Sequence, residues 1–438
     1  MPAARARPWM SAASIAREQA VLDSLVGAES DSVADRVERL VVAGRATHET
    51  RCINLNPATN VMNPRAEALL SSGVGTRPSL GHPGAKYETG LHELEEVEVV
   101  AAGLAQRVFR ATFVEVRVAS GSIANLYAFL ATCRPGDRVI VPPPSIGGHV
   151  THHRAGAAGL LGLEIHAAPV DAARFSVDVD GLAEQARRVR PALITIGGSL
   201  NLLPHPVDDV RRIADEVGAA VLFDAAHLAG PIAGGAWPDP LAQGADLMTM
   251  STYKSLGGPP SGLVVTDRAD LAERLDAIAH PGLTANFDVA KTAALAVSLL
   301  DWGLGGREHA RAMVATAARL ADELLALGLP VVTTVRGPTE SHQLALDATG
   351  WGGGQAAAAR LEVAGLLASG IGLPDRESPD GLPGLRLGTN ELVRWGMGPD
   401  EMPELADLLR RALSDPGAAA PGVAALRARF RTLHHVHV

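Results

Sequence analysis

Lys254 is a lysine in an unusual place. It lies in the stretch STYKSLGGPPSG, between an apolar run and a turn rich in glycine and proline. The chain has 438 residues but only two other lysines, Lys86 and Lys291, so nearly all of its basic residues are arginine. A lysine amine forms imines with carbonyl compounds and a guanidinium does not, so Lys254 is a candidate for amine chemistry. Plain solvent exposure is the competing explanation.

Two further predicted strand ends carry residues that suit a ligand. VEVRVASGSIAN runs from a strand through Ser120, Gly121 and Ser122 into a helix. Exposed backbone N–H groups at a helix start can hold a phosphate, although a tight turn would explain the same letters. VLFDAAHLAG ends a strand at Asp224, three residues before His227. A carboxylate there can cap a helix, or it can keep a pyridine nitrogen protonated.

The three strand ends together match a single ligand. Ser251 and Tyr253 add hydroxyl groups beside Lys254, which can form a Schiff base. A phosphate site, a partner for a pyridine nitrogen and an amine for an aldehyde are what pyridoxal 5′-phosphate requires. The sequence therefore predicts this cofactor.

The segments around these residues predict an α/β fold. Short apolar strands alternate with helical patterns, and ligands in such mainly parallel sheets bind beyond the carboxyl ends of the strands. The predicted strands lie in DRVIVPPP, LEIHAAPV, ALITIGGS, AAVLFDAAH, ADLMTMST and GLVVTD, and the helices in NLYAFLATC, VDGLAEQARRV and VDDVRRIADEVG.

Three parts are expected along the chain. Residues 12 to 45 look helical, so residues 1–50 are predicted to be an N-terminal helical arm. Residues 51–304 are predicted to form the large cofactor-binding domain. Residues 305–438 mix helices with short strands and predict a smaller α+β domain, with helices over 309–328 and 355–370.

Composition narrows the possible partners and compartment. The formal net charge of -9 argues against general affinity for nucleic acid or an anionic membrane surface. The two cysteines have no paired spacing, which suits a reducing compartment. We find neither a signal-peptide core nor an apolar run long enough to span a membrane, so a cytoplasmic location is expected. His149, His152 and His153 in HVTHH lack an evident third ligand, and no metal site is predicted.

The motifs ASGSIAN, GGHVTHH, FDAAHLAG, STYKSLGGP and GLRLGT resemble serine hydroxymethyltransferase and its relatives among fold-type I pyridoxal-phosphate enzymes. The resemblance covers about residues 54–402. It implies a mainly parallel seven-stranded sheet with helices on both faces, and a homodimer or homotetramer with active sites at the subunit interface. Its substrates would be a small amino acid and an aldehyde.

Each matching position inherits a role from the resemblance. Lys254 would be the Schiff-base lysine, Asp224 would pair with the pyridine nitrogen, and His227 would lie near the phenolic oxygen. The remaining roles are phosphate binding by Gly121 and Ser122, stacking on the ring by His149, a contact to the phenolic oxygen by Ser199, and binding of the substrate carboxylate by Arg386.

One segment departs from the family. Folate-using relatives carry K-Y-A-E-G-Y-P-G-K-R-Y-Y-G-G, whereas this chain has RPSLGHPGAKYETG. Leu80 replaces the glutamate that serves proton transfer with folate, and Pro78 and Glu88 replace two tyrosines. Tyr253 and Pro260 replace a histidine and an arginine around the lysine. The half of the site that would bind the cofactor is kept, and the half that would bind folate and substrate is rebuilt.

These departures favour cleavage or transfer at the Cα–Cβ bond of a β-hydroxy amino acid without tetrahydrofolate. Threonine aldolases, α-methylserine aldolases and threonine transaldolases are relatives of this kind. The base for the β-hydroxyl is sought among His149, His152, Glu88 and Tyr253, with a histidine favoured. Alternatives are a folate-dependent hydroxymethyltransferase, a racemase or aminotransferase, and a pyridoxal-phosphate-binding protein without turnover. Arg386 favours an enzyme.

Overall fold

The computed structural model describes residues 7–284, 286–379 and 381–437. The chain divides into two compact units, residues 1–52 and 53–438. In the first unit the predicted helical stretch is two helices, α1 (Ala12–Asp23) and α2 (Ser30–Ala46). Gly27 in the intervening turn has a φ of 74°, a conformation that favours glycine. Residues 1–6 of the predicted arm lie outside the described residues.

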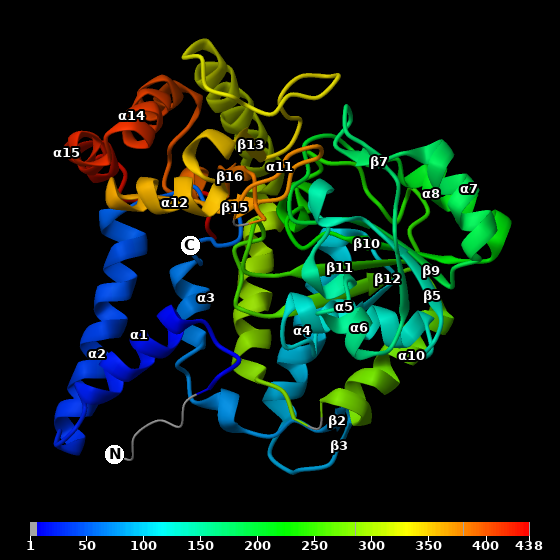
Figure 1. The fold of residues 1–438 in the computed structure, drawn as a ribbon. Helices are drawn as coiled ribbons and strands as arrows, with labels where there is room; N and C mark the ends of the chain where they lie inside the picture. Colours follow the sequence, from blue (N-terminus) through cyan, green and yellow to red (C-terminus); the bar gives the residue numbers. More distant parts are fainter. Residues whose placement is uncertain (1–6, 285, 380, 438) are drawn as a thin grey trace. The chain divides into compact units, whose positions relative to one another are not determined.

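A seven-stranded sheet forms the centre of the second unit (Figure 1). All pairings are parallel except those of β12, which is antiparallel to both of its neighbours. In spatial order the strands are β4 (Phe113–Glu115), β12 (Gly262–Thr266), β11 (Leu247–Ser251), β10 (Ala220–Asp224), β9 (Leu193–Gly197), β5 (Arg138–Val141) and β6 (Glu164–Ala167).

Helices cover both faces of this sheet because its strands are apolar on both faces. Ile140 and Phe223 belong to one buried cluster, whereas Val139 and Leu222, their chain neighbours, belong to another. Successive side chains in a strand point to opposite faces, so each cluster marks one face. The first cluster includes residues of α4 (His92–Phe109), α7 (Val179–Val189), α8 (Val207–Val217), α9 (Ala229–Ala233) and α11 (Val289–Ala326). The second includes residues of α5 (Gly121–Thr132), α6 (Ala157–Leu160) and α10 (Ala269–Ala277).

A smaller antiparallel sheet follows in the C-terminal third of the chain. Its strands, β13 (Gln343–Asp347), β16 (Gly384–Gly388) and β15 (Ser369–Ile371), lie beside α11 (Figure 1). Residues of β13 and β16 belong to a third buried cluster with parts of α12 (Gly354–Val363), α14 (Met402–Ser414) and α15 (Pro416–Ala428). The predicted seven-stranded α/β fold with a smaller α+β part is confirmed.

The remaining short elements connect these layers. They are β1 (Ile53–Asn54), which pairs in parallel with β14 (Leu366–Leu367), α3 (Pro64–Leu69), the hairpin of β2 (Gly81–His82) and β3 (Ala85–Lys86), the hairpin of β7 (Val170–Asp171) and β8 (Ser176–Val177), and α13 (Asn390–Arg394). Within the described residues no helix is both long and apolar enough to cross a membrane.

Two predicted elements differ from the structure. The helix expected over 355–370 ends at Val363, because Gly365 adopts a φ of 87° and the chain turns into β14 and β15. The helix expected over 309–328 begins earlier, at Val289. Since this helix runs through residue 304, the domain boundary predicted there remains a prediction.

Candidate active site

Lys254 lies just beyond the end of β11, and the surrounding loop holds it firmly. The side chain of Asn60 donates to the carbonyl of Lys254 at 3.0 Å. The hydroxyl of Ser255 donates to the carbonyl of His227 at 2.6 Å, which joins the lysine loop to the loop after β10. The Lys254 amine lies 3.1 Å from Nε2 of His227.

The environment of Lys254 favours the neutral amine. Burial lowers its pKa from 10.5 to about 8, and the Asp224 carboxylate only partly opposes this shift. The other two lysines are engaged differently. Lys86 is buried in an ion pair with Glu98 at 2.7 Å, and Lys291 is partly exposed near Asp288. Lys254 is thus the lysine whose surroundings suit reaction with an aldehyde.

Asp224, at the end of β10, is a buried carboxylate with a full set of donors. Its Oδ2 accepts from the Asn125 amide and from Nε2 of His152, both at 2.9 Å, and its Oδ1 accepts from the backbone N–H of Ala226 at 3.0 Å. Burial alone would raise its pKa, but the bond to His152 and nearby positive charge hold that pKa well below its usual range. Asp224 is therefore ionised and able to keep a facing nitrogen protonated.

The start of α5 meets the end of β11 at close range. Ser120 caps the helix by accepting from the backbone N–H of Ile123 at 3.2 Å. A Cβ atom on Gly121 would collide with the hydroxyl of Ser251 and lie 3.1 Å from its Cβ. The first N–H groups of an α-helix have no partner inside the helix, so those of Gly121 and Ser122 are suited to an anion.

Arg386, in β16, points a buried guanidinium at the same region. Its Nη1 donates to the carbonyl of Ser199 at 2.6 Å, and its Nη2 donates to the hydroxyl of Ser369 at 3.0 Å. Burial lowers its pKa to about 10, so it keeps its charge at neutral pH. A buried cation with a planar fork suits a carboxylate.

Most of the predicted site residues line one small cavity at the strand ends. The predicted residues on its wall are Ser120, Gly121, Ser122, His149, Ser199, Asp224, Ser251, Tyr253 and Lys254, accompanied by Asn125, Gly198 and Ala226. His227 and Arg386 adjoin it through Lys254 and Ser199. Glu88 is not on this wall, and its buried Oε2 has no hydrogen-bond partner among the described residues.

The two candidate histidine bases are differently placed. His152 lies behind the cavity, with Nε2 on Asp224 and Nδ1 buried without a described partner. His149 is on the cavity wall, where burial lowers its pKa to about 4. Its Nδ1 accepts from the backbone N–H of Thr151 at 3.3 Å, so its ring proton sits on Nε2. His149 therefore lines the cavity with a ring whose proton is on Nε2.

Sequence reasoning missed three side chains that organise this site. Asn125 is held by Thr249, whose hydroxyl donates to Oδ1 of the amide at 2.6 Å, and it in turn holds Asp224. Ser369 binds the guanidinium of Arg386. Gln343 lies 3.3 Å from Nδ1 of His227. The only sequence signal for Gln343 was a polar residue opening the apolar strand QLALD.

These residues fit pyridoxal phosphate by their chemistry and spacing. The cradle at Gly121, which a Cβ would fill, suits the phosphate, the ionised Asp224 suits the pyridinium nitrogen, and the low-pKa amine of Lys254 suits the aldehyde. The set comes from the start of α5 and the ends of β10 and β11. Three neighbouring strand ends were predicted, but β4, the strand before α5, ends at Glu115 and is separated from β11 by β12.

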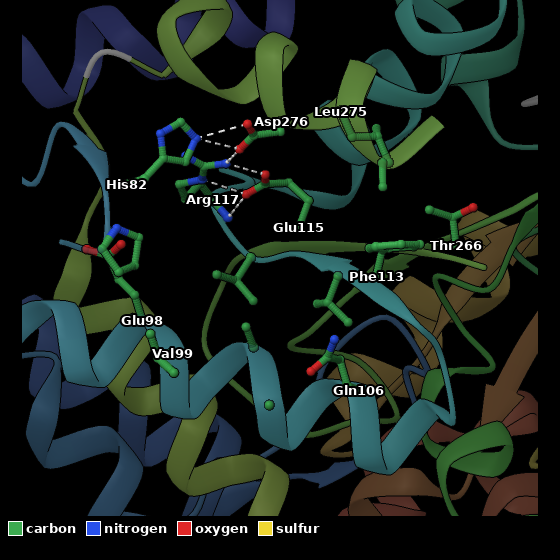
Figure 2. A pocket seen from close by; sticks show the side chains of 16 residues that line it. His82, Glu98, Val99, Gln106, Phe113, Glu115, Arg117, Thr266, Leu275 and Asp276 are labelled. Carbon is green, nitrogen blue, oxygen red and sulfur yellow. Dashed lines mark hydrogen bonds and ion pairs between the residues drawn. The ribbon is translucent and has the colours of Figure 1, made fainter. Parts of the chain in front are cut away.

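A second cavity of about 460 Å³ lies between α4 and the edge strand β4 (Figure 2). Val99, Phe113 and Leu275 are among its apolar lining residues. Arg117 closes one side, bonded to Glu115 and Asp276 at 2.6 Å each (Figure 2). Arg117, Glu115 and Asp276 are thus paired with one another, and this cavity shares no lining residue with the cavity at Lys254.

Comparison with known proteins agrees with this geometry. The model of the serine hydroxymethyltransferase family matches residues 34–409. An α-methylserine aldolase from Variovorax paradoxus is 59% identical over 98% of this chain and 97% of its own. One from Ralstonia sp. is 52% identical, over 98% and 99%. A serine hydroxymethyltransferase from Methanopyrus kandleri is 38% identical, over 91% and 95%. This chain therefore belongs to the serine hydroxymethyltransferase family and is a pyridoxal-phosphate-dependent enzyme of the aldolase and hydroxymethyltransferase type.

Proposed function

We propose that this enzyme cleaves the Cα–Cβ bond of an α-methyl-β-hydroxy amino acid, with α-methylserine as the first candidate, and that it does so without tetrahydrofolate. The products would be alanine and formaldehyde. The Cα–Cβ bond breaks, the β-hydroxyl loses its proton to a base, and Cα gains a proton. Bound pyridoxal phosphate supplies an acceptor for the electron pair released at Cα.

Leu80 is the observation that carries this proposal. It precedes β2 in the segment where folate-using relatives have the glutamate that serves proton transfer with folate. An alkyl side chain cannot move a proton. Direct aldol cleavage has smaller requirements: Arg386 to hold the carboxylate, Asp224 to maintain the charge on the ring nitrogen, and one base. The names of the aldolase relatives support the same substrate class.

The proton acceptor for the β-hydroxyl is proposed to be the amine of Lys254. Nδ1 of His149 already accepts from Thr151, and Nε2 of His152 is engaged by Asp224, which disfavours both histidines as bases. The pKa of Lys254, about 8, lies close to neutrality, where a base works best. Tyr253 lines the same cavity and is the remaining rival. Tyr253→Phe should keep the rate of aldehyde release within a few-fold, whereas loss of a general base costs about 10²–10⁴-fold.

The deciding experiment measures aldehyde release in folate-free buffer. The purified enzyme is offered α-methylserine, serine and threonine, each with and without tetrahydrofolate. We expect release from α-methylserine at a rate that tetrahydrofolate leaves unchanged. Turnover of serine that is negligible alone and rises by orders of magnitude with tetrahydrofolate would establish the folate-dependent alternative. Leu80→Glu should not create that dependence, because Pro78 and Glu88 also differ from the folate-using pattern.

We further propose a homodimer or homotetramer located in the cytoplasm. Val37, Leu40 and Val41 give α2 exposed apolar side chains, which suit burial against another subunit. The two cysteines, Cys52 and Cys133, are buried and have no paired spacing in the sequence, in keeping with a reducing compartment. Sedimentation equilibrium of the purified protein tests the assembly, and a monomer at micromolar concentration would contradict it.

A further inference from the structure

Gln343 is a buried amide that connects two parts of the active site. It opens β13 and is inaccessible to solvent. Its side chain contacts the segment of Ser199 and Asn201 on one side and the ring of His227 on the other. Buried amides need partners for both their oxygen and their nitrogen, so the orientation of this amide is informative.

Two backbone groups fix which end of the amide faces His227. Oε1 accepts from the backbone N–H of Asn201 at 3.1 Å, and Nε2 donates to the carbonyl of Ser199 at 2.9 Å. A backbone N–H can only donate and a carbonyl can only accept. A flipped amide would place like groups together at both contacts. The NH₂ group of Gln343 is therefore the end that meets the imidazole.

This NH₂ group lies 3.3 Å from Nδ1 of His227, which must then accept. Burial lowers the pKa of His227 well below its usual value, and Lys254, Arg386, His342 and His149 all act in the same direction. The ring is thus neutral and carries a single proton. We propose that Gln343 is a positioning residue that holds this proton on Nε2 of His227, so that the imidazole acts as a donor toward Lys254 and the bound cofactor.

The two groups near Nε2 act on this tautomer in opposite directions. Nζ of Lys254 lies at 3.1 Å and Nη1 of Arg386 at 3.4 Å. Nη1 of Arg386 has two N–H groups: one donates to Ser199 at 2.6 Å, and the other competes with the Gln343 amide for the ring, favouring a bare Nε2 from 3.4 Å. Lys254, with a pKa of about 8, can become a neutral amine and accept from Nε2–H. Gln343 thereby favours the uncharged, reactive form of the lysine.

The hydrogen-bond network of Gln343 extends away from the active site to Asn201 and His205. Asn201 donates from Nδ2 to the carbonyl of Gly198 at 2.9 Å, which leaves its Oδ1 to accept from Nε2 of His205 at 2.8 Å. The network of Gln343, Asn201 and His205 thus has a defined donor direction throughout. The inference deepens the site assignment and rests on the proposed role of Lys254 in the reaction.

The test reads the tautomer directly in cofactor-free protein. ¹⁵N-labelled histidine distinguishes protonated from bare ring nitrogens by NMR, and His227→Asn identifies the signals of His227. Spectra are recorded above the Lys254 pKa of about 8, where the amine is no longer obliged to donate. We expect the wild type to carry its proton on Nε2. A proton on Nδ1 would overturn the proposal, whether or not the enzyme proves to be an aldolase.

The Gln343→Met variant tests whether the Gln343 amide causes this tautomer of His227. Without the amide donor, Arg386 and Lys254 can donate to Nε2, so the proton should shift from Nε2 to Nδ1. Thr195→Val is the matched control, since it removes another buried polar group, on β9, that has no described partner. It should leave the His227 signals unchanged. If the Gln343→Met variant folds and the proton stays on Nε2, the role of Gln343 is refuted. If the variant does not fold, the wild-type spectrum alone decides the proposal.

Discussion

Arg386 and Lys254 are the two side chains whose individual chemistry most determines what this site can bind. Arg386 is a buried cation that keeps its charge, whereas Lys254 is a buried cation that loses its charge near neutral pH. The difference lies in their intrinsic basicity, because burial lowers the pKa of both. The site therefore offers a permanent charge for a carboxylate beside an amine that is available for covalent chemistry.

Arg386→Lys should weaken amino-acid binding by about ten- to a hundred-fold. Lysine keeps the charge but loses the planar fork, and a charged hydrogen bond of this type contributes about 1.5–3 kcal/mol. Titration of the absorbance of the bound cofactor with an amino acid measures the effect. Arg376→Lys is the control, since Arg376 is exposed and pairs at the surface with Asp347. Equal affinities in wild type and Arg386→Lys would locate the carboxylate site elsewhere.

The lowered pKa of Lys254 predicts a pH dependence for cofactor uptake. Only the neutral amine attacks an aldehyde, and burial moves the midpoint for that form from 10.5 to about 8. The rate at which cofactor-free enzyme takes up pyridoxal phosphate should therefore rise with pH and level off above about 8. Stopped-flow absorbance follows the reaction. A rate still climbing steadily beyond pH 10 would show an unperturbed lysine.

The residues at strand ends could be predicted, but their hydrogen-bond partners could not. Asp224 ends β10 and Lys254 follows β11, so their common location follows from the rule that parallel strands end at one edge. Gln343 lies far along the chain from His227, and nothing in the local pattern of either segment indicates the contact. His152 was expected among the candidate bases, yet the packing of its loop directs Nε2 to Asp224.

At the scale of elements, the site depends on how closely α5 approaches β11. Gly121 has no side chain at the point where the helix start meets Ser251, and this allows the approach. Gly121 could be identified in the sequence because it belongs to the motif ASGSIAN. The end of α12 was harder to predict, since Gly365 stops the helix in the middle of an apolar run that suits a helix equally well.

Gly121→Ala should weaken cofactor binding by about tenfold or more. The added methyl collides with Ser251, and overpacking of this kind costs about 1–3 kcal/mol. Equilibrium dialysis with pyridoxal phosphate gives the affinity. Gly103→Ala in α4 is the matched control, because beyond the adjoining backbone of its own helix no atom lies within 4 Å of the position of its added Cβ. It should leave affinity unchanged, and a similar loss in both variants would argue against a specific contact at the phosphate cradle.

At the scale of the whole molecule, the smaller sheet region includes residues from near the start of the second unit. Ile53 and Leu55 belong to the buried cluster of the C-terminal third. Their backbone N–H groups donate to Gly365 at 2.9 Å and to Leu367 at 2.8 Å. The strands of the large sheet lie between these two segments in the chain. The chain segments before and after the sheet are therefore joined to each other by backbone hydrogen bonds.

Leu55→Ala should lower the free energy of unfolding by about 2–5 kcal/mol, as expected for a fully buried leucine. Leu55 is inaccessible to solvent. Denaturant unfolding followed by circular dichroism measures the change. Leu160→Ala removes the same atoms from a leucine that is 85% exposed, and should change stability by no more than about 0.5 kcal/mol. Comparable losses in the two variants would contradict the assigned core.

The pairing of β1 with β14 has a consequence for synthesis on the ribosome. At the usual rate of about 5–20 residues per second, residues 53–55 emerge roughly 15 to 60 s before residues 365–367 exist. Throughout that interval they are an unpaired apolar segment, while the strands of the large sheet emerge and find one another. The nascent chain can complete its C-terminal core only after translation has passed residue 367, so the first residues of the second unit are among the last to fold.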